Sequence, residues 1–130
     1  MAIKRFKNSD SVSLKAYHKE LEVMKMLSHY GSHPNIIQMI GTFQNLNYSF
    51  IILEKAFHGN VYQFLRKNQS KIDIKIKLRW VLQIAQALAF MHYHHDYDQI
   101  WHRDIKAENI LITSLGSTQD CTSAKICDFG

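Results

Sequence analysis

The sequence predicts a mixed α+β fold, and three observations support this prediction. Several short apolar segments lie between clusters of turn residues, which is typical of strands. Two longer segments repeat apolar residues every three or four positions, as helices with a packed face do. Hydrophobic residues make up 46% of the 130 residues, which is enough for one ordinary core, so by length alone the chain would form one domain.

The first part of the chain predicts a strand followed by a helix. Residues 1–6 alternate enough to form a strand, and residues 8–11 form a polar break with good helix-capping residues. Residues 12–28 place five apolar side chains on one helical face, which should be packed. These side chains are Leu14, Tyr17, Leu21, Met24 and Leu27. The helix must end before Pro34, the only proline of the chain.

The later elements follow from the same patterns. Residues 36–44 and 48–53 look like two strands of an antiparallel pair. A short helix suits residues 61–67, and the run from 74 to about 94 suits a buried helix. We expect the side chains in register on this helix to be Leu78, Val81, Leu82, Ala85, Leu88 and Met91. The last two predicted strands are residues 110–112 and 124–127.

The charge pattern and the cysteines argue against several classes of protein. The net charge is +5, but the basic residues are scattered among acidic ones, so nucleic-acid binding is disfavoured. Cys121 and Cys127 provide neither a disulfide framework nor zinc-type spacing, which fits a reducing compartment. We find no signal peptide and no segment of membrane-spanning length. We therefore expect a cytoplasmic protein.

The most informative segment is Trp101–Asn109, which is followed after a short interval by Asp128-Phe129-Gly130. It places a carboxylate, an ammonium and a carboxamide on one loop, at Asp104, Lys106 and Asn109. These groups can meet a hydroxyl, a phosphate and a metal ion respectively, and the second segment supplies another carboxylate. The H-R-D-x-x-x-x-N and D-F-G motifs that these residues form resemble those of a phosphotransfer centre, and the roles follow from that resemblance.

In order and spacing, these motifs resemble the eukaryotic protein kinase family over the whole chain. Met1–Lys4 is similar to the family's lysine strand, residues 18–24 to its αC helix, and His33–Ile37 to the entry of the next strand. Finer similarities, such as residues 59–65 and Cys127 before the D-F-G motif, point toward the Numb-associated kinases. That group implies substrates among membrane-traffic adaptor proteins.

The resemblance implies a two-lobed fold of which this chain is a central slice. It implies a partial N-lobe over residues 1–54, a hinge over residues 55–59 and a partial C-lobe over residues 60–130. The slice opens at the lysine strand, without the family's glycine-rich loop, and it stops before the activation segment. We therefore expect the parent protein to be an active kinase and this chain alone to be inactive.

Four residues take catalytic or metal-binding roles by resemblance. Asp104 would accept or orient the proton of the substrate hydroxyl, and Lys106 would offset the charge of the transferred phosphate. Asn109 and Asp128 would bind Mg²⁺, which prefers hard oxygen donors, although single Asp and Asn residues in loops usually serve turns. A lysine two residues after Asp104 is the family's serine/threonine pattern. The implied reaction is phosphoryl transfer from ATP to Ser and Thr hydroxyls of protein substrates.

The nucleotide-binding residues also come from the resemblance. Lys4 resembles the lysine that holds the α- and β-phosphates of ATP and pairs with a glutamate of the αC helix. Two glutamates compete for that pairing, and the family's pattern favours Glu20 over Glu22, which would be solvated. The adenine site would consist of Ala2 and Leu111 on the ring faces, Leu53 at the gatekeeper position, and the backbone from Glu54 to Ala56.

Other functions stay open at this point. A pseudokinase or truncated decoy would bind partners without transferring phosphate; the intact site residues argue against it, whereas the missing segments argue for it. A helical interaction module with accidental motifs is a third possibility. His92, His94 and His95 invite a metal site, but the spacing of His92 and His94 puts their side chains on different helix faces.

Overall fold

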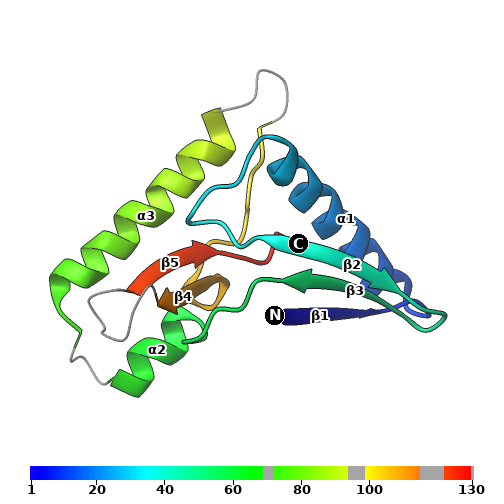
Figure 1. Cartoon of the computed structure of the whole chain (residues 1–130), viewed down its shortest axis with the longest axis horizontal. Helices are drawn as coiled ribbons and strands as arrows, with labels where there is room; N and C mark the ends of the chain where they lie inside the picture. The colour runs from blue at the N-terminus through cyan, green and yellow to red at the C-terminus, as the bar shows by residue number, and fades with distance from the viewer. Residues whose placement is uncertain (69–71, 94–98, 115–121, 130) are drawn as a thin grey trace. The chain divides into compact units, whose positions relative to one another are not determined.

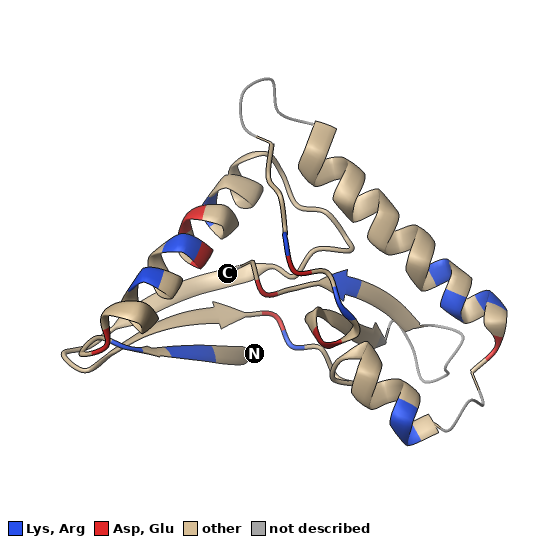
Figure 2. Cartoon of the chain, turned by 180° about the vertical axis from the view of Figure 1, so that it is seen from behind, with Lys and Arg blue, Asp and Glu red and all other residues tan. Residues whose placement is uncertain are grey.

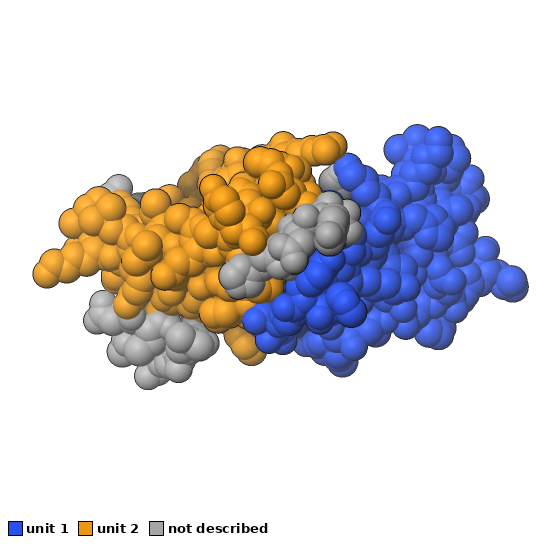
Figure 3. Space-filling view, turned by 90° about the horizontal axis from the view of Figure 1, so that it is seen from above, with its two compact units in different colours: residues 1–32, 37–55, 128–130 blue, residues 33–36, 56–127 orange. Residues whose placement is uncertain are grey.

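The computed structural model describes residues 1–68, 72–93, 99–114 and 122–129. The chain divides into two compact units (Figure 3). Unit 1 comprises residues 1–32, 37–55 and 128–130, and unit 2 comprises residues 33–36 and 56–127. Within the described residues, unit 1 has a three-stranded sheet and an α-helix, and unit 2 has two α-helices and a two-stranded sheet (Figure 1). The predicted α+β class is confirmed.

Unit 1 is built on an antiparallel sheet with the strand order β1-β3-β2. Its strands are β1 (Ala2–Lys7), β2 (Met39–Gln44) and β3 (Tyr48–Leu53). Asn45 closes the turn between β2 and β3, because its side-chain oxygen accepts hydrogen bonds from the backbone N–H groups of Asn47 and Tyr48 at 2.9 and 2.8 Å. Asparagine favours turns for this reason.

Helix α1 (Ser11–His29) packs against this sheet. Asp10 caps the helix by accepting hydrogen bonds from the N–H groups of Val12 and Ser13 at 3.1 and 3.3 Å. The rings of Phe6 on β1 and Tyr17 on α1 meet edge to face at 5.4 Å. The buried residues of the helix are Tyr17, Glu20, Met24 and Leu27. Of the predicted apolar face, Tyr17, Met24 and Leu27 are therefore buried and Leu14 and Leu21 are half-buried, and Glu20 is a polar addition to it.

One predicted strand boundary is wrong, because Asn35 and Ile36 belong to unit 2. The Asn35 carbonyl accepts a hydrogen bond from the N–H of Ile126 at 2.8 Å, and Ile36 forms a parallel bridge with Ile126. The buried Asn35 amide also donates to Ser123 Oγ at 3.2 Å and to the Ala124 carbonyl at 2.8 Å. These bonds engage residues 35–36 elsewhere, so β2 begins at Met39 rather than at residue 36.

Unit 2 combines helices α2 (Val61–Asn68) and α3 (Ile74–Tyr93), a short 3-10 turn η1 (Ala107–Asn109), and strands β4 (Ile110–Ser114) and β5 (Thr122–Ile126). Strands β4 and β5 pair antiparallel. Helix α3 packs against β5, where Trp80 Nε1 donates to Thr122 Oγ1 at 3.2 Å and Gln83 Oε1 accepts from the Ala124 N–H at 2.9 Å. The interval between β4 and β5 lies outside the described residues.

The predicted packed face of α3 is largely wrong. The buried residues are Ile76, Trp80, Ile84, Ala87 and Met91, so of the predicted set only Met91 is buried. Leu88 is half-buried and Ala85 is exposed. Ile74, Leu78, Val81 and Leu82 are 59–66% exposed. The helix carries apolar residues on both faces, so periodicity could not decide which face packs against β5. Among the described residues, no helix is long and apolar enough to cross a membrane.

The sheet of unit 1 offers a matched test of its core. Ile51 on β3 is fully buried, whereas Ile40 on β2 is 57% exposed. We expect Ile51→Ala to reduce the free energy of unfolding by about 2–5 kcal/mol, because it removes buried methyl groups and leaves a cavity. Ile40→Ala should cost less than about 1 kcal/mol. Urea unfolding followed by circular dichroism measures both, and equal losses would contradict the assigned burial.

Candidate active site

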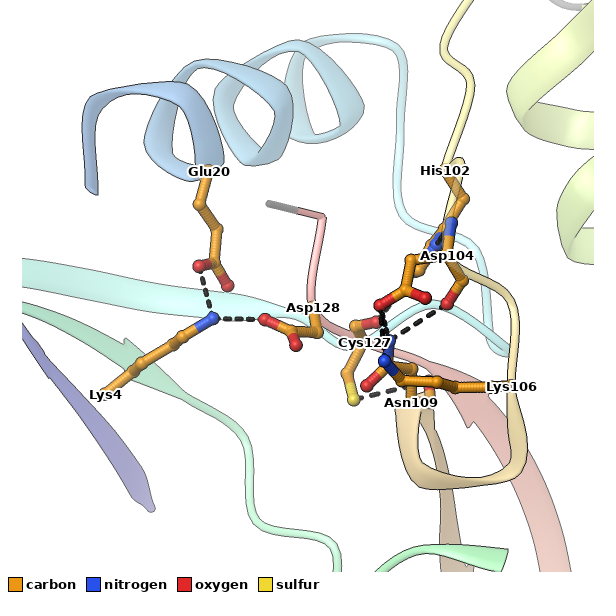
Figure 4. Close-up of polar contacts among 8 residues, drawn as sticks. All are labelled: Lys4, Glu20, His102, Asp104, Lys106, Asn109, Cys127 and Asp128. Atoms are coloured by element: carbon orange, nitrogen blue, oxygen red, sulfur yellow. Dashed lines mark hydrogen bonds and ion pairs between the residues drawn. The ribbon is translucent and has the colours of Figure 1, made fainter. Parts of the chain in front are cut away.

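The candidate catalytic loop lies in unit 2, between α3 and η1, and the buried ring of His102 holds it in place (Figure 4). His102 Nδ1 accepts a hydrogen bond from the backbone N–H of Asp104 at 3.3 Å, and Nε2 lies 2.8 Å from the carbonyl oxygen of Cys127. Because a carbonyl can only accept, Nε2 carries a hydrogen in this contact. His102 thereby links the backbone of Asp104 to the residue that follows β5.

The backbone of Arg103 adopts a left-handed conformation, with φ of 66°. Residues other than glycine rarely adopt this conformation, and it costs conformational energy. Arg103 lies between His102, whose side chain is buried, and Asp104, whose side chain is exposed. The sharp turn of the loop therefore separates the residue that anchors the loop from the residue that faces solvent.

Three side chains that the sequence singled out meet on this loop (Figure 4). Lys106 Nζ lies 2.7 Å from Asp104 Oδ2, and their side chains are 49% and 54% exposed. Asn109 Nδ2 donates to Asp104 Oδ2 and to the Asp104 carbonyl, both at 2.9 Å. The carboxylate is therefore oriented by two donors while it stays accessible to a polar substrate.

The same contacts affect the protonation of Asp104. The hydrogen bond from the Lys106 ammonium lowers the pKa of Asp104, and the Asn109 amide and the positive charge of Lys106 act in the same direction. A carboxyl group with a lowered pKa stays ionised at neutral pH. Asp104 is therefore ready to accept a hydrogen bond from a hydroxyl group without first losing a proton.

The side chain of Asn109 suits a metal ligand. Asn109 is 5% exposed, and its carboxamide oxygen has no hydrogen-bond partner among the residues that the structure describes. Its backbone is also fixed, because the carbonyl accepts from the Cys127 N–H at 3.0 Å. A buried, oriented amide oxygen without a partner is the kind of hard donor that Mg²⁺ accepts.

A second group of charged residues lies in unit 1 (Figure 4). The Lys4 ammonium donates to Glu20 Oε2 at 2.5 Å and also to the carboxylate of Asp128. Lys4 lies on β1, Glu20 on the buried face of α1, and Asp128 close to the end of the chain. The competing residue Glu22 is exposed. Of the two glutamates that the sequence left in competition, the structure places Glu20 against the lysine.

Burial and the neighbouring charges have opposite effects on the pKa values of Lys4 and Glu20. Burial opposes the charge of Lys4, but the hydrogen bonds to Asp128 and Glu20 outweigh it and raise the pKa of the ammonium. For Glu20, burial is the largest effect and raises the pKa of the carboxyl group, although Lys4 partly compensates. Lys4 therefore stays charged, and the buried carboxylate depends on it as a counter-ion.

The predicted adenine residues lie partly in each unit. In unit 1, Ala2 pairs with Leu53 across β1 and β3. Glu54 continues this sheet, because its N–H donates to the Gln38 carbonyl at 3.0 Å and its Oε1 accepts from the Gln38 N–H at 2.9 Å. Ala56 and Leu111 belong to unit 2, where Leu111 on β4 is half-buried. The adenine site itself stays a prediction.

Sequence reasoning missed the role of Asn35. Its buried amide ties residues 33–36 to β5, whereas the motif was interpreted only as the entry to a strand. An asparagine directly after a proline usually indicates a turn, so this bond could not be predicted from the local pattern. The described residues contain no group of three or more His, Cys, Asp or Glu side chains that could hold a metal ion. His94 and His95 lie outside the described residues.

The Asp104–Lys106 contact predicts a measurable pH dependence. A depressed carboxyl pKa favours the folded state above the pKa of the unfolded chain, and this contribution disappears as the pH falls through the folded pKa. Lys106→Met should therefore move the titration midpoint of Asp104 upward, toward the ordinary value of about 3.9. Carbon NMR of the Asp carboxyl groups measures it, with Asp104→Asn for assignment and exposed Lys67→Met as control. An unchanged midpoint in Lys106→Met would refute the contact.

Comparison with known proteins agrees with this geometry. The sequence model of the protein kinase domain matches residues 1–130. The probable serine/threonine-protein kinase gdt2 of Dictyostelium discoideum is 34% identical over 130 residues, which are 100% of this chain and 7% of that protein. Aurora kinase of Schizosaccharomyces pombe is 32% identical over 133 residues, covering 100% of this chain and 33% of that protein. Serine/threonine-protein kinase SIK1 of Mus musculus is 32% identical over 121 residues, covering 93% and 14%.

The chain thus spans a third or less of the length of these curated relatives. The family match nevertheless extends from the first residue to the last, and it includes both groups of charged residues. This chain belongs to the protein kinase domain family.

Proposed function

We propose that this chain is part of a serine/threonine protein kinase, which transfers the γ-phosphoryl group of ATP to Ser and Thr hydroxyls of proteins. The observation that carries the proposal is the half-exposed Asp104 carboxylate, oriented by Lys106 and Asn109 on an anchored loop. Relatives that are named serine/threonine-protein kinases support the reaction class. The lysine two residues after Asp104 supports Ser and Thr over Tyr as acceptors.

In this proposal, the loop positions the acceptor. The Asp104 carboxylate accepts a hydrogen bond from the substrate hydroxyl. This bond orients the hydroxyl oxygen toward the phosphoryl group. Because its pKa is lowered, Asp104 is a weak base, so its main contribution is orientation and late proton acceptance. Lys106 already lies beside Asp104, and its ammonium offsets negative charge near the transferred group.

The Lys4 group would hold the nucleotide. Lys4 would bind the phosphates, and Glu20 would keep the ammonium oriented from its buried position on α1. Asn109 and Asp128 offer the oxygen donors that suit Mg²⁺. Bound magnesium and ATP supply the transferable phosphoryl group and neutralise part of its charge. The family resemblance implies that both groups of charged residues serve one bound ATP, with Ala2, Leu53, Glu54, Ala56 and Leu111 around the adenine.

The finer interpretations are part of the same proposal. The similarities of residues 59–65 and of Cys127 before the D-F-G motif support membership of the Numb-associated group, with adaptor proteins of membrane traffic as substrates. The composition supports a cytoplasmic location. The division into an N-lobe over residues 1–54, a hinge and a C-lobe over residues 60–130 also comes from the family resemblance. We expect the 130-residue chain alone to lack activity, because positioning supplies most of the catalysis in this family.

A phosphotransfer assay tests the proposal. The full-length protein should phosphorylate Ser or Thr in a protein substrate, and Asp104→Asn should lower kcat by about 10²–10⁴ while the KM for ATP changes little. The loss follows because the carboxamide can no longer accept the hydroxyl proton. The 130-residue chain, assayed in parallel, should show no turnover. Nucleotide-dependent thermal stabilisation without turnover in the full-length protein would instead favour a pseudokinase.

The two glutamates of α1 provide a matched pair of variants. Glu20→Gln removes one of the two carboxylates that pair with Lys4, so we expect kcat/KM for ATP to fall at least about tenfold, or ~1.4 kcal/mol. Glu22→Gln changes the same chemical group on the exposed side of the helix and should leave kcat/KM within about twofold of the wild type. Steady-state kinetics at saturating protein substrate measure both values. A larger effect of Glu22→Gln would reverse the assignment.

A further inference from the structure

The sheet of unit 1 has a second face, which points away from α1. Lys4 and Phe6 contact Glu20 and Tyr17 of the helix, so the alternate residues of β1 point to the other side. Residues that are paired directly across antiparallel strands share a face. The register therefore defines an outer face that includes Ile3, Arg5, Lys7, Phe43, Tyr48 and Phe50.

Aromatic rings dominate the centre of this outer face. The rings of Phe43 and Phe50 lie 5.8 Å apart, and those of Tyr48 and Phe50 lie 6.1 Å apart. The guanidinium carbon of Arg5 lies 4.8 Å from the centre of the Tyr48 ring. Phe43 is 55% exposed and Ile3 is 64% exposed. Exposed apolar side chains that gather on one face of a sheet are typical of interaction sites.

The charge of the outer face has one sign. Strands β1, β2 and β3 contain no Asp or Glu, and the basic residues of the sheet are all on β1 (Figure 2). Arg5 and Lys7 therefore border the aromatic rings without an acidic neighbour in the sheet. A second copy of this chain would bring the same basic residues together, and like charges across an interface are unfavourable. The face thus favours an acidic occupant over self-association.

We propose that the outer face binds an acidic segment of a partner protein that also carries aromatic or aliphatic side chains. The apolar side chains of that segment pack on Phe43 and Phe50, and its carboxylates reach Arg5 and Lys7 at the border of the sheet. Aromatic residues and arginine are the residue types that contribute most to protein interfaces. The site lies on the opposite face of the sheet from the Lys4–Glu20 pair, so binding does not depend on phosphoryl transfer.

Fluorescence anisotropy with the full-length protein tests this proposal. The probe is a short labelled peptide of Glu, Asp, Phe and Leu, compared with one peptide that has Lys in place of the acids and another that has Ser in place of Phe and Leu. We expect the acidic apolar peptide to bind most tightly. Phe43→Ser and Arg5→Glu should each weaken its binding at least about tenfold. Arg5→Glu should also improve binding of the basic peptide.

Val12→Ser serves as the control, because Val12 is 72% exposed on α1 and is not one of the strand residues that form the outer face. This variant should bind the probe like the wild type. Circular dichroism and thermal unfolding check that Phe43→Ser and Arg5→Glu remain folded, which their surface positions favour. Equal binding by all variants would overturn the proposal. Tighter binding of a single-stranded oligonucleotide, or a dimer that Phe43→Ser abolishes, would overturn it in favour of another occupant.

Discussion

The backbone of Cys127 is the constraint on which the candidate catalytic loop depends. Its carbonyl accepts from the His102 ring, and its N–H donates to the Asn109 carbonyl. These two bonds attach both ends of the segment from His102 to Asn109 to a residue that directly follows β5. The strand is itself held by α3, by β4 and by the Asn35 amide. The exposed side chains of this candidate loop therefore rest on a buried, hydrogen-bonded framework, which holds them in position.

The two groups of charged residues differ in how far water screens their charges. Asp104 and Lys106 are about half exposed, so water screens their interaction and both remain available to a substrate. Glu20 is almost completely buried, and its charge would be costly without Lys4 beside it. The Lys4–Glu20 pair thus contributes orientation of the lysine more than stability. Asp128 shares the same ammonium, which places a carboxylate of the D-F-G motif within reach of β1.

Much of the local structure could be predicted from the sequence, because it depends on neighbouring residues. Turn residues around Asn45 and Pro34, the cap at Asp10 and the apolar period of α1 all act over a few positions. The packed face of α3 could not be predicted, since Ile84 and Leu82 are similarly apolar, yet Ile84 is buried and Leu82 is exposed in the folded chain. The same holds for Asn35, whose partners lie almost ninety residues away. The site residues came from motif resemblance, and periodicity alone would not have found them.

The aliphatic side of α3 has a practical consequence for anyone who prepares this polypeptide. Ile74, Leu78, Val81 and Leu82 form a continuous stripe on one side of the helix, and more than half of each side chain faces water. Association with another hydrophobic surface removes such a stripe from water and is therefore favourable. Chaperones, detergent micelles and other copies of this chain all offer such a surface. Recombinant yield and colloidal behaviour will therefore respond more to this stripe than to any residue of the catalytic loop.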